Sequence, residues 1–191
     1  MRPITLDGFE KTFAADPDPW NTFADRDEAC KRQAIRHAIG SARRGRVLEI
    51  AAGNGSNSRM LATRSLRLDA TEATATGTRL VAAALPASRR ARAIRLAVPG
   101  RFPRPGYDAI VIAELLYYLS PAAMRRTARD SARAVRRGGL LVLAHHRIDF
   151  HDFAQHAADL HRTFLAQTGR AWSVRAVRRT GRWTVHACLR R

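Results

Sequence analysis

Residues 46–55 read Arg-Val-Leu-Glu-Ile-Ala-Ala-Gly-Asn-Gly and carry the strongest local signal in this chain. The apolar part, Arg46–Ala51, is predicted as a strand, and the glycines form a turn that opens a helix at Ser56. Glycines in such a turn let a ligand lie against the backbone, and free N–H groups at the helix start favour polar or anionic ligand atoms. By itself, the segment also fits a dinucleotide site or a plain tight turn.

Apolar runs alternate with amphipathic stretches along the chain, which indicates a parallel sheet covered by helices. The most apolar run, Tyr107–Ala113, is predicted to be central, because strands covered on both faces are apolar throughout. The predicted helices are Asp25–Ile39, Ser56–Thr63, Thr74–Leu85, Pro121–Arg136 and Phe150–Gln167, and the other predicted strands are Leu66–Thr71, Ala93–Ala97, Leu140–Ala144, Trp172–Arg178 and Trp183–Leu189. We predict an α/β fold: a Rossmann-like, doubly wound, mostly parallel sheet with a C-terminal antiparallel hairpin.

A single domain is predicted over residues 1–191, with an N-terminal lid or helical segment in residues 1–40 and the Rossmann-like core in residues 41–191. Residues 1–22 form a lead-in that ends in Asp16-Pro-Asp-Pro-Trp-Asn21. The two prolines force extended backbone there and predict a loop with Trp20 at its tip.

The composition is strongly basic, with 34 Lys and Arg against 16 Asp and Glu and a formal net charge of +18. Such a charge points toward nucleic acid or an anionic membrane. However, only Lys11 and Lys31 are lysines, and arginine is spread along the chain beside comparably abundant alanine. A GC-rich coding sequence produces this usage without selection for binding, so the charge leaves open whether the arginines are functional or compositional.

No stretch of the sequence reaches the roughly 18–20 unbroken apolar residues that a membrane span needs, and no signal peptide pattern opens the chain. Cys30 and Cys188 lie far apart without metal-ligand spacing, and we expect free thiols. We therefore expect a cytoplasmic protein with no membrane partner.

Two more carboxylates are predicted to lie at strand ends. Glu72 ends the second strand, where Rossmann-type sites hold the ribose hydroxyls of a cofactor with an acid. Asp69 is its rival but lies within the strand, and a solvated acid at a helix start is the alternative for Glu72. Glu114 follows the Tyr107–Ala113 strand, where open α/β sheets place ligands, and is expected to contact the cofactor or a basic substrate group.

These motifs resemble the class I S-adenosylmethionine methyltransferases over nearly the whole chain. Two departures are visible: Ala51 replaces the first glycine of the turn, and Leu96-Ala-Val-Pro99 lacks the acid that often holds the adenine amino group. A backbone contact near Ala97 is expected to replace that acid. The Asp-Pro-Asp-Pro-Trp lead-in, Lys31-Arg32 and Glu114-Leu-Leu-Tyr-Tyr-Leu119 look most like the nodulation protein S (NodS-like) family of N-methyltransferases.

The resemblance implies that the chain is an enzyme with S-adenosyl-L-methionine as its cofactor, and that Arg32 pairs with the methionine carboxylate. The residues expected to bind the cofactor are Trp20, Arg32, Glu49, Ala51, Gly53, Asn54, Gly55, Glu72, Ala97 and Glu114. The resemblance supports methylation of an amine better than it supports any particular amine.

The candidate catalytic residues are His146, His145 and Tyr117. An amine must lose a proton before it can attack a methyl group, and an imidazole with a pKa near 6.5 can accept that proton. We expect His146 to be this base and His145 to be its direct competitor, because adjacent residues of a strand point to opposite sides. Tyr117 is expected to orient the amine. The alternative is one packed and one solvated histidine.

No metal site is expected. His146, His151, His156 and His161 recur every five residues, which turns a helix by about 500°, so they cannot share one helical face.

The sequence thus predicts a methyltransferase that acts on a small molecule with a free amine, as a monomer or homodimer. The alternatives are O- or carboxyl-methylation, an RNA or DNA substrate, a non-catalytic binding module with this fold, and a nicotinamide-dependent oxidoreductase. The chain lacks Asn-Pro-Pro-Tyr or Asp-Pro-Pro-Tyr after the fourth strand, and neither cysteine follows a proline, so the common DNA base methyltransferases fit poorly. We do not expect a nucleic-acid partner.

Overall fold

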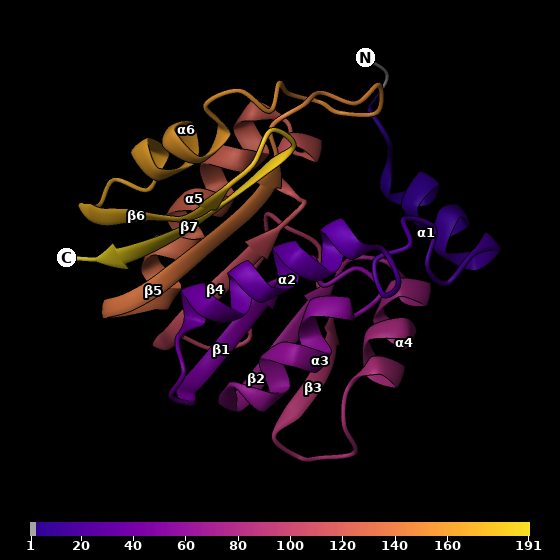
Figure 1. Ribbon diagram of the computed structural model, residues 1–191, viewed down its shortest axis with the longest axis horizontal. Coiled ribbons are helices and arrows are strands. Elements are labelled where there is room, and N and C mark those ends of the chain that lie inside the picture. Colours follow the sequence, from indigo (N-terminus) through magenta and orange to yellow (C-terminus); the bar gives the residue numbers. More distant parts are fainter. Residues whose placement is uncertain (1–2) are drawn as a thin grey trace.

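The computed structural model describes residues 3–191 and contains a seven-stranded sheet with helices on both faces (Figure 1). Residues 1 and 2, which begin the predicted lead-in and domain, lie outside the described residues. The strands are β1 (Arg44–Ile50), β2 (Ser65–Glu72), β3 (Ala91–Arg95), β4 (Tyr107–Ala113), β5 (Val135–His146), β6 (Trp172–Arg179) and β7 (Trp183–Arg190).

The order of strands in the sheet is β3-β2-β1-β4-β5-β7-β6, so β4 is central. Neighbouring strands from β3 to β5 are parallel, whereas β7 is antiparallel to both β5 and β6. These pairings confirm the predicted α/β fold class, the central strand and the C-terminal hairpin at the sheet edge.

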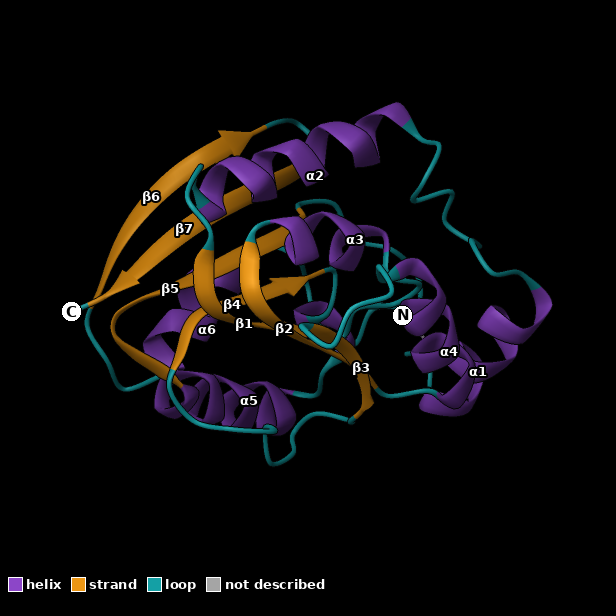
Figure 2. Ribbon diagram, turned by 90° about the horizontal axis from the view of Figure 1, so that it is seen from below, coloured by secondary structure: helices purple, strands orange, loops and turns teal. Residues whose placement is uncertain are grey.

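Three helices pack on one face of the sheet, namely α2 (Arg26–Ile39), α3 (Ser56–Thr63) and α4 (Ala75–Ala84). The other face is covered by α5 (Pro121–Ala134) and α6 (Leu160–Gln167), so the sheet is the middle layer of three (Figure 2). A short 3₁₀ helix, η1 (Leu116–Tyr118), links β4 to α5, and α1 (Leu6–Ala15) lies beside α4. Among residues 3–191, no helix has the length and apolar character needed to cross a membrane.

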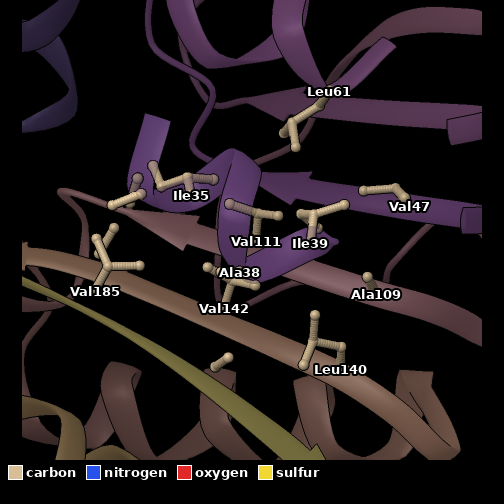
Figure 3. Packing of buried hydrophobic residues seen from close by; sticks show 14 of the residues in the cluster. Ile35, Ala38, Ile39, Val47, Leu61, Ala109, Val111, Leu140, Val142 and Val185 are labelled. Atoms are coloured by element: carbon tan, nitrogen blue, oxygen red, sulfur yellow. The ribbon is translucent and has the colours of Figure 1, made fainter. Parts of the chain in front are cut away.

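The buried face of α2 explains how the segment before the first strand joins the core. Ile35 and Ile39 are fully buried, and with Ala38 they pack against β1, β4 and β5 (Figure 3). Residues three and four apart share one face of a helix, which is why these side chains point together toward the sheet. The core therefore includes α2, a helix that the sequence assigned to the lid segment 1–40.

Within the lead-in, the loop predicted at Asp16–Asn21 is confirmed. Before it lies α1, whose first turn is capped by the Thr5 hydroxyl accepting from the Gly8 N–H at 3.1 Å. Leu6, Phe9 and Phe13 recur at helical spacing, which is the sequence signal for this helix.

The predicted helix Phe150–Gln167 is wrong in its first half, because only Leu160–Gln167 is helical. The backbone N–H groups of Ala154 and Gln155 donate to the carbonyl of Tyr117, at 2.8 and 3.1 Å, instead of to carbonyls of their own segment. These tertiary hydrogen bonds hold residues 150–159 as a loop against η1. The helical spacing used in the argument against a histidine metal site therefore does not apply before Leu160.

Ala51, which stands where the turn favours glycine, adopts a left-handed backbone conformation with φ of 56°. We expect Ala51→Gly to stabilise the protein by about 0.5–1 kcal/mol, because relief of the strain outweighs the extra freedom of glycine in the unfolded chain. Denaturant unfolding measures this change. Ala52→Gly is the control and should be destabilising, because the backbone of Ala52 is not left-handed. A loss of stability in Ala51→Gly would contradict the prediction.

Candidate functional site

A cavity of about 540 Å³ opens at the carboxyl ends of the parallel strands, next to α1. This volume is in the range of small-molecule sites. The predicted site residues that line it are Trp20, Ala51, Gly53, Asn54, Glu72, Glu114, Tyr117 and His146. The predicted residues outside its lining are Arg32, Glu49, Gly55, Ala97 and His145.

Glu72 lies at the end of β2 and faces the glycine turn. Its carboxylate accepts hydrogen bonds from the Gly53 N–H at 3.0 Å and from both the N–H and the hydroxyl of Thr74 at 3.0 Å. Burial raises the pKa of Glu72, although these hydrogen bonds oppose the shift. The rival Asp69 has a different role, since Tyr107 donates to it at 2.8 Å and Arg92 and Arg104 pair with it away from the cavity.

Hydrogen bonds of the Asn54 side chain connect the lead-in loop to the glycine turn. The Asn54 amide donates to Asp18 at 2.8 Å and to the Thr22 hydroxyl at 2.9 Å, and Thr22 in turn donates to Asp18 at 2.8 Å. Burial opposes the ionisation of Asp18, but hydrogen bonds from Phe23, Thr22 and Asn54 lower its pKa. This network holds Trp20, which is 43% exposed, at the edge of the cavity. Asn54 therefore acts on the pocket through the lead-in.

Glu114 is the centre of a polar network at the end of β4. Its carboxylate pairs with Lys31 at 2.5 Å, accepts from the Tyr117 hydroxyl, and accepts from the backbone N–H of His146 at 3.3 Å. Its φ of 51° is unusual for a residue other than glycine, and such strained backbone is characteristic of functional sites. Burial and the nearby carboxylate raise the pKa of Tyr117 well above its usual value, so its hydroxyl stays protonated.

Lys31, rather than Arg32, is the cation that lines the cavity. Burial opposes the charged form of Lys31, but the carboxylates of Glu114 and Glu28 together raise its pKa. Arg32 instead donates to the carbonyl of Thr22 at 2.9 Å. Adjacent helical residues point about 100° apart, so Arg32 does not line the cavity beside Lys31, and its pairing with the methionine carboxylate stays a prediction.

His146 and His145 point to opposite sides of β5, as the alternation of a strand requires. His146 lines the cavity, and its Nδ1 lies 3.9 Å from Glu114 without a hydrogen-bond partner among the described residues. Burial lowers the pKa of His146, although Glu114 opposes the shift, so the imidazole is neutral at neutral pH.

His145 belongs to a chain of three histidines on the other side, and it is buried together with His161. Its Nε2 accepts from the N–H groups of Leu115 and Leu116 at 3.2 and 3.1 Å, so its Nδ1 carries the proton. That Nδ1 lies 2.9 Å from His161, which lies 2.9 Å from His186. Burial, followed by the neighbouring histidine, lowers the pKa of both His145 and His161. The candidate role of His145 as a base is corrected: it supports the backbone that follows Glu114.

Gly55 and Ala97 lie outside the cavity lining, and their expected contacts with the cofactor stay predictions. Gly55 has φ of 86°, and a Cβ there would lie 2.7 Å from Ala84, so this glycine allows α3 to approach α4 closely. Leu96 and Val98 line the cavity, whereas Ala97 between them does not. Adjacent residues of an extended chain point to opposite sides, which explains why the Ala97 side chain is outside the lining. The contact expected near Ala97 is one of the backbone and stays a prediction.

Glu49 is buried beneath the glycine turn and accepts from the Ser58 hydroxyl at 2.5 Å. Its side chain does not reach the cavity lining, and the expected contact with the cofactor stays a prediction. Burial raises its pKa to about 8 from the ordinary value of 4.5, so the carboxyl is neutral at pH 7.

We expect the free energy of unfolding to fall as the pH rises from 4.5 to about 8, because over this range only the unfolded state releases the Glu49 proton. Glu49→Gln removes this titration and should flatten that part of the profile. Urea unfolding at several pH values measures it, and an unchanged slope in Glu49→Gln would show that Glu49 ionises normally.

Comparison of the sequence with known protein families and with curated proteins finds no match. Solved structures do match. N-methyltransferase NodS from Bradyrhizobium japonicum WM9, in complex with S-adenosyl-L-homocysteine, has a TM-score of 0.80 at 19% identity and 98% coverage of both chains. A SAM-dependent methyltransferase from Leishmania major has a TM-score of 0.79 at 16% identity, over 97% of this chain and 81% of that one.

An O-methyltransferase family protein from Burkholderia thailandensis has a TM-score of 0.75 at 15% identity, over 98% of this chain and 63% of that one. The chain has the fold of the class I methyltransferases. At these identities the similarity establishes the methyltransferase fold, and the activity has to be argued from the residues of the pocket.

Several residues of the pocket in this methyltransferase fold are missed by sequence reasoning. Lys31 has a sequence signal in its i,i+3 spacing from Glu28, which places both on one face of α2. Asp18 and Thr22 have no such signal for their contact with the pocket, because their shared partner Asn54 is distant in sequence.

Proposed function

We propose that this chain is an S-adenosylmethionine-dependent methyltransferase that methylates the amine nitrogen of a small molecule. The proposal rests on the charge of the cavity lining, which is opposite in sign to the net charge of the chain. The chain has a net charge of +18, yet the charged residues lining the cavity are Glu28, Glu72, Glu114 and Asp152 against Lys31, with no arginine among the described lining residues. An acidic pocket attracts a cationic ligand and repels phosphate, which favours an amine over a nucleic acid.

The residues of the turn fit the proposed cofactor. A Cβ added at Gly53 would meet only a Phe13 ring atom at 3.9 Å, so the turn leaves space for a ligand against the backbone. Glu72 offers a carboxylate to the ribose hydroxyls, and Leu96 and Val98 offer apolar surface to the adenine. Lys31 takes the place expected for Arg32 as the cation on the methionine side.

S-Adenosylmethionine supplies an electrophilic methyl group bonded to a sulfonium sulfur. In the transfer a nitrogen–carbon bond forms as the carbon–sulfur bond breaks, and the nitrogen needs a free lone pair. His146 is neutral and accepts the proton that the ammonium loses at Nε2, because its Nδ1 is enclosed beside Glu114. Tyr117 keeps its own proton and holds Glu114. The surrounding aromatic side chains exclude water and fix the amine for attack.

The test is methyl transfer from labelled S-adenosylmethionine to a panel of amines, alcohols and carboxylic acids matched in carbon skeleton. We expect label in the amines only. Label confined to alcohols or acids would replace N-methylation with O-methylation, and cofactor binding without any transfer would indicate a binding module.

A duplex RNA serves as a second ligand, and we expect its binding to vanish near physiological salt. Tight binding that resists salt would contradict a small-molecule substrate.

A further inference from the structure

We propose that the pocket holds a second cationic group of its substrate at Asp152, so that the substrate is a small diamine or an amine bearing another basic nitrogen. The inference rests on the proposed methylation of an amine. It concerns the part of the cavity formed by residues 150–153, which the methyl-transfer chemistry does not use.

The carboxylates of the cavity differ in their ion-pair and hydrogen-bond partners. Glu28 and Glu114 share the ammonium group of Lys31. Glu72 is held by backbone and side-chain donors of the turn. Asp152 forms no ion pair with any residue of the described chain, and its carboxylate is close enough to the Tyr118 hydroxyl to help raise the pKa of that group. A carboxylate in a partly enclosed cavity without a cation is electrostatically complementary to a cationic ligand.

Aromatic rings surround this part of the cavity. The Tyr118 ring meets Phe9 edge-on at 5.0 Å and Phe153 edge-on at 5.3 Å, and Phe150 lies 5.3 Å from Phe153. All four line the cavity with Asp152. Their apolar surface suits the carbon chain that joins two amino groups. These rings come from α1, η1 and the loop after β5.

The backbone of Asp152 is also tied to the start of the lid. The Ile4 N–H donates to the Asp152 carbonyl at 3.1 Å, which joins the segment before α1 to the loop that carries the carboxylate. Asp152 is therefore held at the cavity wall by a tertiary contact. The two acidic positions have different tasks: Glu114 and His146 receive the nitrogen that reacts, and Asp152 receives the nitrogen that stays protonated.

The test compares diaminobutane with aminobutane, and diaminohexane with aminohexane, as substrates of the full chain. We expect the wild type to prefer the diamines through a lower KM. Asp152→Asn should raise the KM for the diamines about tenfold or more and leave that for the monoamines nearly unchanged, as loss of a charge-assisted contact predicts. Asp159→Asn is the control, because it removes the same charge at an exposed position whose φ of 56° asparagine tolerates.

Calorimetric titration of diaminobutane in the presence of S-adenosylhomocysteine measures the same contact without turnover. Loss of this binding in Asp152→Asn supports the inference even if no amine is methylated, in which case only the proposed function fails. Equal KM values for diamines and monoamines in the wild type overturn the inference and leave amine methylation standing. Weaker binding of S-adenosylmethionine but not of S-adenosylhomocysteine in Asp152→Asn also overturns it, because Asp152 would then serve the sulfonium charge.

Discussion

Replacing His146 with alanine is expected to lower turnover at neutral pH by about a hundredfold to ten-thousandfold, the usual contribution of a general base. The protonated amine has no lone pair, and His146 is the neutral imidazole that lines the cavity next to Glu114. Cofactor affinity should be nearly unchanged. Because the free-amine fraction grows with pH, alkaline conditions should recover part of the lost turnover.

The pH profile distinguishes this role from a structural one. Burial lowers the pKa of His146, so wild-type turnover should remain high down to a pH below the ordinary value near 6.5 and fall once the imidazole is protonated. His156→Ala, at an exposed position outside the cavity, should leave the profile unchanged. His145→Ala should instead lower the free energy of unfolding, since it removes the acceptor for the N–H groups of Leu115 and Leu116. If His146→Ala keeps the wild-type profile, the amine loses its proton without this residue.

The second large effect is expected at Glu72. Glu72→Ala removes the acceptor for the ribose hydroxyls, at a cost on the order of 2–3 kcal/mol, or roughly thirtyfold to a hundredfold in affinity. Calorimetry with S-adenosylhomocysteine measures this loss. The variant also leaves the N–H groups of Gly53 and Thr74 without their partner, so thermal unfolding has to be recorded beside it.

Asp69→Asn is the matched control, because Asp69 lies on the same strand but binds Tyr107 and two arginines away from the cavity. It should weaken the fold without changing cofactor affinity. Unchanged affinity for S-adenosylhomocysteine in Glu72→Ala would show that another residue of the turn binds the ribose.

Local patterns in the sequence determine the layout of this protein. The alternation of apolar runs and amphipathic stretches predicts the sheet and its helices, and the hairpin at Thr180-Gly181 is predicted at its edge. The glycine turn and Glu72 could be placed because both lie at the ends of predicted strands, and parallel strands end at one edge. Helix α1 could also have been predicted from the sequence, because Leu6, Phe9 and Phe13 recur at helical spacing.

Only the tertiary structure decided which of two adjacent residues reaches the cavity. Lys31 rather than Arg32 and His146 rather than His145 face it, because the rotation of α2 and the register of β5 are set by packing across the sheet. The same holds for the loop 150–159, where hydrogen bonds to Tyr117 replace a helix that the sequence favoured. A local pattern in the sequence indicates whether a segment repeats with the period of a helix or of a strand. Contacts between distant segments fix the orientation of that element and so determine which of its residues reach the site.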